Sequence, residues 1–553
     1  MNTDNFLGKF ARCFLALLFL QKTAFAQIRP VDPPRLAVGI VVDQMRYDFL
    51  LKYYDKFGEG GFKRLLEGGF NCENTNYDYA PTYTGPGHAS IYAGTTPAVH
   101  GIIGNDWYSR EEMHPVYCAS DPDARNVGGT EEAGKMSPRR LRTANVADEL
   151  RLFSNKKSKV VGVAIKDRGA ILPAGHCPNA AFWFDQKTAG WMSCNWYMDS
   201  LPGWVRDFNK KELPEKLIAG GWSPLAETLR PGRSIADDNR YEDPYKGEKS
   251  PVFPHDLPKI AQKEGQGIAL AASPFGNELT EEFAKSAIIN EKLGADEWPD
   301  LLALSFSSTD LVGHSFGPSS LEVEDTYLRL DRVLADFFQF LDKKVGAKKW
   351  AVFLTADHGV AYNSNLLRDD SLTMAGFWGR AKLADTLNRI LEPEFGKKMV
   401  LSALNGNIVF DREKIAAAKL DFSKIEAATV GFLENLEGVY AVMTAKQLTE
   451  NEYTQMPKSL VQRGFLPHES GDLVVIFAPG MLEWSQRGSS HGSPWSYDTR
   501  VPCLWYGWKI PRGTFSGPLE ITDIAPTLSV ILNIPFPGGC TGQPIEPLLS
   551  KIK

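Results

Sequence analysis

The sequence predicts an α/β protein with a doubly wound, mostly parallel central sheet and helices on both faces of that sheet. Short, wholly apolar segments recur along the chain, helix-compatible segments lie between them, and polar side chains directly follow the apolar segments. Strands that are buried on both faces, as in a parallel sheet, read as continuous apolar runs. The alternation of such strands with helices is typical of doubly wound sheets.

The elements of this sheet can be assigned in chain order. Four apolar runs predict the central strands, at residues 36–42, 159–165, 301–306 and 350–355, and a further strand is expected at 502–506. Helices are expected at 61–66, 88–92, 137–153, 278–293, 319–342 and 522–532. The helix at 137–153 is predicted from Ser137 and Pro138, because serine is a good N-cap and proline is tolerated in the first turn.

The first 26 residues have the pattern of a secretory signal peptide. Lys9 and Arg12 precede an apolar run at 13–20, and the small-residue site 24–26 follows it. We expect cleavage before Gln27 and a periplasmic or secreted protein. The apolar run is too short to span a bilayer comfortably and no run of about 18 apolar residues follows, so no stable membrane insertion is expected.

The rest of the chain is expected to form a catalytic core that is interrupted by an insertion. Residues 27–361 and 471–553 are assigned to the core, and 362–470 to a small α+β insertion. The insertion is predicted from a strand-like run at 400–410, a helix at 423–436 and an apolar run at 439–443. The apolar segment 473–478 is interpreted as a return to the core, and 202–259 as an ordered surface excursion.

Charge and cysteine content narrow the class of protein. The formal net charge is −6, which does not suit a nucleic-acid-binding protein. Six cysteines follow the signal segment, namely Cys72, Cys118, Cys177, Cys194, Cys503 and Cys540. In an exported protein six cysteines suggest up to three disulfides, and the fifteen possible pairings stay open.

Polar side chains follow all four predicted central strands. Asp43 comes directly after the first, Lys166 and Arg168 after the second, Asp310 after the third, and the pair Asp357 and His358 after the fourth. The carboxyl ends of parallel strands meet at one edge of a sheet, where ligands bind in doubly wound proteins. The sequence therefore predicts a functional site at this edge.

Thr84 is a candidate nucleophile for this site. It precedes Gly85, Pro86 and Gly87 at the expected start of a helix, where backbone N–H groups and the helix dipole favour an anion. The alternative is an ordinary N-cap threonine. A threonine hydroxyl is a weak nucleophile unless it is activated, for example by a metal ion.

Six carboxylate and imidazole side chains are candidate metal ligands: Asp43, Asp310, His314, Asp357, His358 and His491. Such oxygen and nitrogen donors suit catalytic zinc, and pairs of divalent ions can hold both oxygens of an in-line displacement. Lys166, Arg168 and Asn105 could bind the oxygens of a phosphoryl group. Individually, each of these residues could equally be a turn, capping or solvated surface residue.

Seven motifs together resemble the alkaline phosphatase superfamily, and most closely its threonine-nucleophile, phosphate-irrepressible members. The motifs are DQMRYD, PTYTGPGHASIYAG, GIIGNDWY, KDRGA, SSTDLVGH, TADHG and SSHGSP. The resemblance implies hydrolysis of small phosphate monoesters through a phosphothreonine at Thr84, with release of inorganic phosphate.

The resemblance also implies a role for each candidate residue. Two Zn²⁺ ions would be bound per chain. Asp43, Asp357 and His358 would hold the ion that activates Thr84. Asp310, His314 and His491 would hold the ion that takes the leaving-group oxygen. Asn105, Lys166 and Arg168 would bind the non-bridging oxygens, with Lys166 in the place of the magnesium site of serine-type relatives.

Alternatives remain open at this stage. A phosphodiesterase or nucleotide pyrophosphatase of the same superfamily would share the metal ligands but typically lacks the lysine–arginine pair. A sulfatase or a phosphoglycerate mutase fits less well, because residue 84 is threonine and the chain carries an export signal. An inactive metal- or phosphate-binding relative is the non-enzyme alternative. The preferred monoester and the oligomeric state, of which a monomer is one option, are not determined by the sequence.

Overall fold

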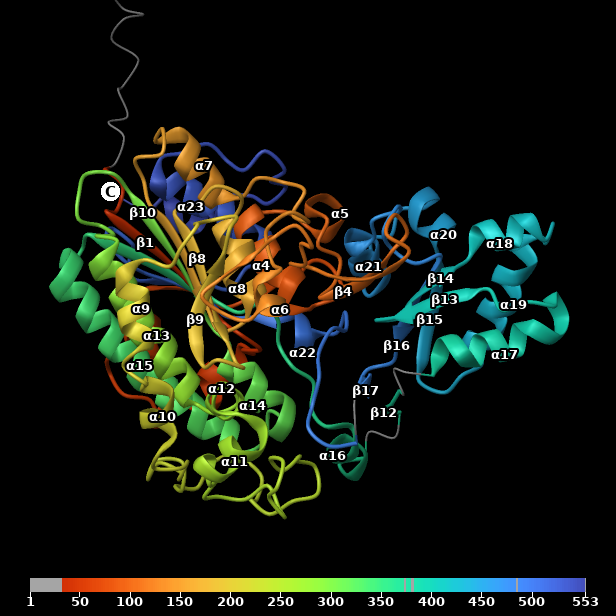
Figure 1. Cartoon of the computed structure of the whole chain (residues 1–553), viewed down its shortest axis with the longest axis horizontal. Helices are drawn as coiled ribbons and strands as arrows, with labels where there is room; N and C mark the ends of the chain where they lie inside the picture. Colours follow the sequence, from red (N-terminus) through yellow and green to blue (C-terminus); the bar gives the residue numbers. More distant parts are fainter. Residues whose placement is uncertain (1–31, 372–373, 379–381, 484–485, 553) are drawn as a thin grey trace, which may run out of the picture. The chain divides into compact units, whose positions relative to one another are not determined.

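A computed structural model describes residues 32–552 apart from 372–373, 379–381 and 484–485. The predicted signal segment 1–26 lies outside the described residues. The main element is a ten-stranded mixed sheet (Figure 1). In sheet order its strands are β20 (Gly513–Phe515), β2 (Phe70–Cys72), β19 (Cys503–Gly507), β11 (Trp350–Thr355), β1 (Leu36–Val42), β10 (Asp300–Phe306), β7 (Val160–Ala164), β8 (Ala180–Asp185), β9 (Gly190–Cys194) and β6 (Asn126–Val127).

The middle of this sheet is parallel, as the apolar runs predict. β11, β1, β10, β7 and β8 are parallel neighbours, whereas β19 and β9 run antiparallel on either side. The four predicted central strands are confirmed, and so is the α/β class. In the paired register Val41 lies opposite Thr355, and Val42 opposite Phe306. The carboxyl ends of β11, β1 and β10 therefore lie together at one edge.

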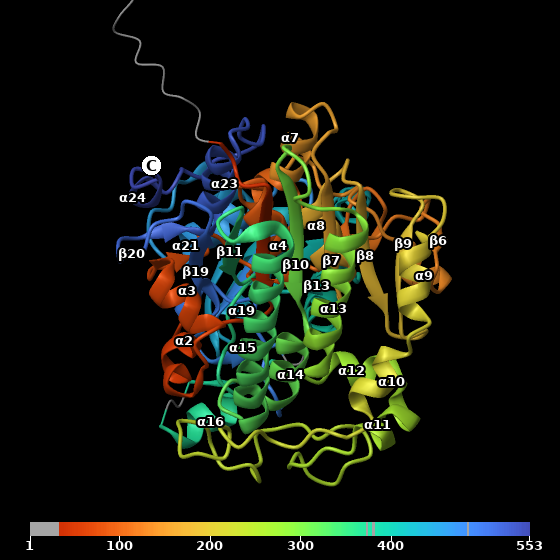
Figure 2. The ribbon, with the colours of Figure 1, turned by 90° about the vertical axis from the view of Figure 1, so that its left-hand side faces the viewer.

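Helices cover both faces of the main sheet (Figures 1 and 2). On one face lie α9 (Gly203–Asn209), α13 (Phe275–Asn290) and α15 (Leu321–Leu341), and on the other α4 (Thr84–Ala93), α7 (Val146–Phe153), α8 (Asp167–Ala174) and α23 (Ile524–Leu532). α15 shows why the sequence forms them: Ser320 caps its first turn by accepting the N–H of Val323 at 3.1 Å, and its apolar stripe is buried.

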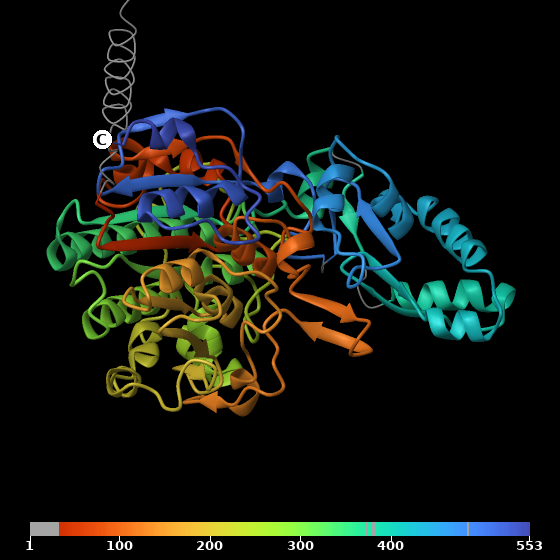
Figure 3. The same ribbon diagram turned by 90° about the horizontal axis from the view of Figure 1, so that it is seen from above.

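A second, four-stranded sheet has its own apolar core. Its order is β13 (Val400–Leu404), β14 (Asn407–Phe410), β16 (Leu473–Phe477) and β15 (Val439–Thr444), and α17 (Leu383–Phe395) and α19 (Phe422–Glu434) pack on it. The β-hairpin of β4 (Asp106–Ser109) and β5 (His114–Tyr117) reaches this part of the chain (Figure 3). The Asn405 amide donates to the Asp106 carbonyl at 2.8 Å, and the Trp107 indole donates to Glu469 at 3.1 Å.

The remaining elements are shorter. The other α-helices of the described residues are α2 (Asp48–Lys52), α3 (Phe62–Gly68), α5 (Pro97–His100), α6 (Glu131–Gly134), α10 (Leu213–Ile218), α11 (Leu257–Glu264), α12 (Gln266–Ala271), α14 (Ser308–Phe316), α16 (Ser364–Asp369), α18 (Arg412–Ala417), α20 (Ala445–Glu450), α21 (Lys458–Gly464), α22 (Ser496–Thr499) and α24 (Glu546–Leu549). Small sheets join β18 (Arg500–Val501), β3 (Thr75–Asn76) and β21 (Leu519–Glu520), and β12 (Gly376–Phe377) with β17 (Met481–Leu482).

Two sequence predictions about these elements are wrong. The helix expected at 137–153 begins only at Val146, because Asn145 and Asp148 form a reciprocal capping box there and the Ser137 hydroxyl instead donates to Asp121. The segment 473–478 does not return to the main sheet: β16 pairs with β14 and β15. Its apolar residues are buried in the second core, and an apolar run alone does not say which sheet buries it.

The expected disulfides are not formed in the part of the chain that the structure describes. All six cysteines there are free thiols. Cys72 and Cys503 lie on the paired strands β2 and β19, next to the paired residues Asn71 and Leu504. The contact between the two thiols contributes to raising the pKa of Cys72 far above its usual value.

Among the described residues, no helix is both long and apolar enough to cross a membrane.

We predict that His100 makes the stability of the fold depend on pH. Its ring is fully buried; Nδ1 accepts the N–H of Ile102 at 3.1 Å, and Nε2 lies 2.8 Å from the Ser90 hydroxyl. Burial lowers its pKa from 6.5 to about 3, so only the unfolded chain takes up a proton as the pH falls below 6.5. The stabilisation is complete above pH 6.5 and is lost progressively toward pH 3.

The measurement is urea unfolding of the wild type and His100→Gln at pH 8 and pH 5. Between these values the wild type should lose about 2 kcal/mol more unfolding free energy than the variant. The exposed His114→Gln serves as the matched control and should behave like the wild type. Equal pH dependence of all three proteins would contradict the prediction.

Candidate active site and metal centre

The edge formed by the central strands carries the predicted polar residues. Asp43 directly follows β1, and Asp357 and His358 follow β11. Asp310 lies in the first turn of α14, immediately after β10, and Lys166 is the N-cap residue of α8, after β7. The parallel register thus brings side chains that are up to 315 positions apart in the chain to one place, as the sequence predicts.

The six predicted donors form two groups of three. In each group the ligand atoms lie within 4.8 Å of one another, and the groups are Asp43, Asp357 and His358, and Asp310, His314 and His491. The rings of His358 and His491 stack with centroids 3.4 Å apart, so the two groups adjoin. His491 comes from the loop that follows β17, which the spacing of the strands alone could not place.

All three histidines are oriented by the backbone. Nδ1 of His314 lies 2.8 Å from the Ser489 carbonyl oxygen, Nδ1 of His358 lies 2.9 Å from that of Gly359, and Nδ1 of His491 lies 2.9 Å from that of Thr82. A carbonyl oxygen only accepts, so Nδ1 carries the proton and Nε2 carries the lone pair. In each ring Nε2 faces a carboxylate of the cluster. This is the arrangement that orients histidine for metal binding.

The charges of the cluster favour a cation. Burial raises the pKa of Asp43 to about 6 and that of Asp357 well above its usual value. Repulsion from Asp310 adds to both effects, and repulsion from Asp43 adds to the effect on Asp357. Asp43 Oδ1 and Asp357 Oδ2 are buried without a hydrogen-bond partner among the described residues. Burial lowers the pKa of His491 to about 3, which keeps its ring neutral. Orphaned carboxylate oxygens beside neutral imidazoles are a donor set that fits divalent metal ions.

Thr84 lies beside the first of these groups. It is the first residue of α4, which begins four residues earlier than expected from the sequence. Its buried hydroxyl lies 3.4 Å from His358 Nε2 and 3.4 Å from Arg168 Nη2. A Cβ on Gly87 would lie 2.2 Å from the Asp357 carbonyl oxygen, so glycine lets α4 approach this loop.

The predicted phosphoryl-binding residues contact Thr84, the residue that follows it, or the donor groups. Lys166 Nζ lies 2.7 Å from Asp43 Oδ2 and 2.5 Å from Asp310 Oδ2, and thus links the two donor groups. Asn105 accepts the N–H of Gly85 through Oδ1 at 2.7 Å, which leaves its amide nitrogen to act as a donor. Arg168 thus contacts the hydroxyl itself, Asn105 binds the backbone of the next residue, and Lys166 lies between the two donor groups.

Sequence reasoning missed three residues that position the site. Gln44 donates its backbone N–H to Asp357 at 3.1 Å and its side-chain amide to Asp310 at 2.7 Å. The Tyr117 hydroxyl accepts from Arg168 Nη1 at 3.0 Å and donates to Asp167, so it holds the guanidinium toward Thr84. Gln44 and Asp167 adjoin predicted residues in the sequence, whereas Tyr117 has no local sequence signal.

A hollow of about 150 Å³ opens onto the site. Asn105, His314 and His491 line this hollow on the side of the active site, and Asn405 and Glu483 line it from the segments that follow β13 and β17. A substrate can therefore reach the two donor groups from this side.

Comparison with known proteins places the chain among phosphate-ester hydrolases. The family model of "Type I phosphodiesterase / nucleotide pyrophosphatase" matches residues 37–494. Alkaline phosphatase PafA of Elizabethkingia meningoseptica is 42% identical, over 94% of this chain and 95% of the relative. Alkaline phosphatase PhoV of Synechococcus elongatus is 41% identical, over 96% and 95%. A Myroides odoratus protein named calcium-transporting ATPase is 42% identical, over 93% and 95%.

Solved structures of PafA have the same fold as this chain. The crystal structure of wild-type PafA superposes with a TM-score of 0.91 at 42% identity, covering 94% of this chain and 99% of that one. A second PafA structure, with a TM-score of 0.90 at 41% identity, is of a variant in which a threonine is replaced by serine and an asparagine, a lysine and an arginine by alanine. From the extent of the family model and of these relatives, the chain belongs to the type I phosphodiesterase/nucleotide pyrophosphatase family of the alkaline phosphatase superfamily, with PafA and PhoV as relatives.

Proposed function

We propose that this chain is an exported alkaline phosphatase, a hydrolase that acts on small phosphate monoesters with Thr84 as its nucleophile and releases inorganic phosphate. The observation that carries the proposal is the position of Arg168 beside Thr84 and of Lys166 between two buried groups of candidate metal-ligating side chains. The names of PafA and PhoV support it.

Two Zn²⁺ ions are the proposed cofactors. Asp43, Asp357 and His358 would hold one ion, together with the Thr84 hydroxyl, and Asp310, His314 and His491 would hold the other. Bound divalent ions lower the pKa of a hydroxyl group and stabilise charge on a departing oxygen. The backbone-oriented imidazoles and the orphaned carboxylate oxygens support this assignment.

The other proposed roles, namely nucleophilic attack, binding of the phosphoryl oxygens and positioning of Arg168, belong to side chains of the protein. Thr84 Oγ loses its proton and forms a bond to phosphorus while the bond to the ester oxygen breaks, and the ester oxygen takes up a proton and leaves as the alcohol. Water then cleaves the resulting phosphothreonine, which releases inorganic phosphate and restores the Thr84 hydroxyl. Arg168 offers its planar fork to two non-bridging oxygens, and the Asn105 amide donates to a third position. Lys166 adds a positive charge from Nζ. Tyr117 and Asp167 hold the Arg168 guanidinium in place and do not touch the substrate.

A variant of PafA gives independent support for the roles proposed for Thr84, Asn105, Lys166 and Arg168. The PafA variant was altered at a threonine, an asparagine, a lysine and an arginine, in this chain order. Thr84, Asn105, Lys166 and Arg168 have the same order here. The two residues of the lysine–arginine pair are separated by one residue in both proteins.

A phosphodiesterase or nucleotide pyrophosphatase is the second candidate, because the matching family model carries that name. The metal donors and Thr84 do not distinguish the two functions. A monoester dianion carries more negative charge on its non-bridging oxygens than a diester, which has one such oxygen esterified. The cationic Lys166 and Arg168 favour the monoester, since charge-assisted hydrogen bonds strengthen with the charge of the acceptor. An inactive binding protein is disfavoured by the complete set of nucleophile, donors and cations.

Export and domain organisation remain part of the proposal. The pattern of charged, apolar and small residues at 1–26 supports a cleaved signal and a periplasmic or secreted location. The segment 362–470 is proposed as an insertion in the catalytic core, with the modification that its sheet takes its strand β16 from residues beyond 470.

We predict that Thr84→Gly abolishes turnover, because no other hydroxyl replaces the nucleophile. The loss in kcat should be at least about 10³-fold, as for the removal of other covalent nucleophiles. Phosphate should still bind, since Lys166, Arg168 and Asn105 are unchanged. Release of p-nitrophenol from p-nitrophenyl phosphate and calorimetric phosphate binding measure both. Thr84→Ser is the control, which keeps a hydroxyl and should retain activity; wild-type turnover of Thr84→Gly would remove Thr84 from the mechanism.

The lysine–arginine pair should distinguish monoesters from diesters. In Lys166→Ala and Arg168→Ala, kcat/KM for p-nitrophenyl phosphate should fall by at least about 10²-fold, whereas that for methyl p-nitrophenyl phosphate should change much less. Arg332→Ala, an exposed arginine on α15, is the control. The proposed function fails if the wild type prefers the diester or if both substrates lose activity equally in the two variants.

Metal content should report the two donor groups separately. Purified wild type should contain two zinc ions per chain by inductively coupled plasma mass spectrometry, and dialysis against a chelator should remove the activity until zinc is restored. The double variants Asp357→Asn/His358→Ala and His314→Ala/His491→Ala should each retain about one ion, because each loses one set of donors. Two ions in either variant, or none in the wild type, would refute this assignment.

A further inference from the structure

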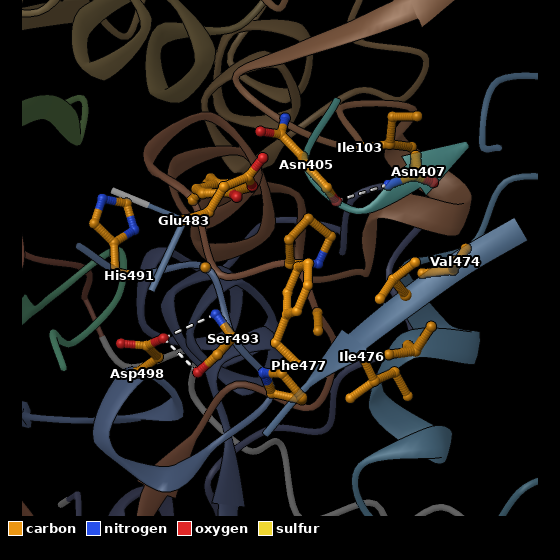
Figure 4. Close-up of a pocket in the computed structure, with 18 of the residues that line it drawn as sticks. Ile103, Asn405, Asn407, Val474, Ile476, Phe477, Glu483, His491, Ser493 and Asp498 are labelled. Carbon is orange, nitrogen blue, oxygen red and sulfur yellow. Dashed lines mark hydrogen bonds between the residues drawn. The ribbon is translucent and has the colours of Figure 1, made fainter. Parts of the chain in front are cut away.

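A second cavity adjoins the hollow over the active site. It has a volume of about 90 Å³ and lies between Ala80–Tyr83, the loop that holds His491, and strand β16. Its lining is mainly apolar and includes Ile103, Phe465, Val474, Ile476, Phe477 and Met481. Figure 4 shows Val474 and Ile476 on one side of this cavity and His491 and Glu483 on the other.

The cavity and the hollow share part of their walls. Tyr83, Asn405, Glu483 and His491 line both. A molecule bound at the active site can therefore extend past His491 into the apolar space without crossing the main sheet. The ring of His491, a proposed metal ligand, lies between the polar donor groups of the active site and the apolar lining of the cavity.

The geometry of the displacement determines which part of a substrate enters this cavity. In an in-line displacement the leaving oxygen lies opposite the attacking one. Thr84 attacks from the side of His358, 3.4 Å away, whereas His491 belongs to the adjoining donor group. The group that is bonded to the leaving oxygen consequently points past His491, toward the cavity.

We propose that this cavity binds the apolar part of the leaving alcohol, and that compact aromatic or branched alkyl monoesters are therefore the preferred substrates. The inference rests on the proposed monoesterase function. An apolar cavity of about 150 Å³ can hold a benzene ring. A single ring therefore fills this cavity of about 90 Å³ and extends into the adjoining hollow, whereas a fused ring system fits less well. The acidic lining residues Glu483 and Asp498 lie on the His491 side, whereas Val474 and Ile476, on the opposite side, have no polar side-chain group with which to bind a polyol or a nucleoside sugar.

The second sheet supplies the selecting residues. Val474, Ile476 and Phe477 come from β16, which pairs with β14 and β15 and not with the main sheet. Phe477 and Val474 are only partly buried, so their side chains are available to a ligand. The insertion would thus determine which alcohol is released, whereas the main sheet determines that phosphate is transferred.

The test compares benzyl phosphate with methyl phosphate, both esters of primary alcohols. The wild type should show a kcat/KM at least about tenfold higher for benzyl phosphate, which is the size of effect that an apolar pocket provides. Val474→Phe fills the cavity and should reduce this ratio at least about tenfold. Val530→Phe, at an exposed position on α23, makes the same substitution elsewhere and should leave the ratio unchanged.

A second variant keeps the test decisive if Val474→Phe does not fold. Val474→Ala enlarges the cavity and should raise the ratio of naphthylmethyl to benzyl phosphate hydrolysis. Equal wild-type rates with benzyl and methyl phosphate, or ratios that neither Val474 variant changes, would overturn the inference and show a packing void only. Failure of the wild type to hydrolyse either monoester would instead overturn the proposed function.

Discussion

Three carboxylates are buried together at one edge of the main sheet, and their repulsion is the constraint on which the site depends. Asp43, Asp310 and Asp357 are at most 2% exposed. Lys166 contacts two of them. Although burial acts the other way, His314 and then Lys166 hold the pKa of Asp310 well below its usual range. One ammonium group does not balance three carboxylates, and the remaining charge is what bound cations would neutralise.

The parallel register allows this concentration of charge. Because β11, β1, β10 and β7 are neighbours, Asp43, Lys166, Asp310 and Asp357 all lie within a few residues of the end of a buried strand. The nucleophile arrives separately, on α4, and contacts the cluster because Gly87 lets the helix backbone approach Asp357. His88 ties the same helix to the sheet: its ring lies 2.9 Å from the Thr84 carbonyl and 2.9 Å from the Ser305 hydroxyl.

The sequence predicts well the central strands and the position of Asp43, Asp310, Asp357 and His358 at their ends, since both follow from short-range patterns. The division of the donors into two groups, with His491 in the second, was expected only from the resemblance. An apolar run marks a strand that is buried on both faces. The polar residue that follows it lies at the carboxyl edge of the sheet, whatever the conformation of the connecting loop. Patterns of this kind cannot show which sheet buries a run, and the prediction for 473–478 failed for that reason. The helix start at Val146 depended on the competition between Asn145 and Ser137 for a capping role, which only the tertiary partner Asp121 decides. Tyr117 was missed because its partners, Asp167 and Arg168, are some 50 residues away.

One hairpin connects the recognition of phosphate with the recognition of the alcohol. β4 begins directly after Asn105, and its partner strand β5 ends with Tyr117, which orients Arg168. Asp106 lies opposite Tyr117 in this hairpin, and its carbonyl accepts the Asn405 amide from the second sheet. Asn405 in turn lines both the hollow over the site and the apolar cavity. The position of the second sheet therefore affects both the phosphoryl-binding residues and the leaving-group cavity. A relative that keeps the six metal donors but differs in this hairpin or in β16 can retain the same reaction and act on a different ester.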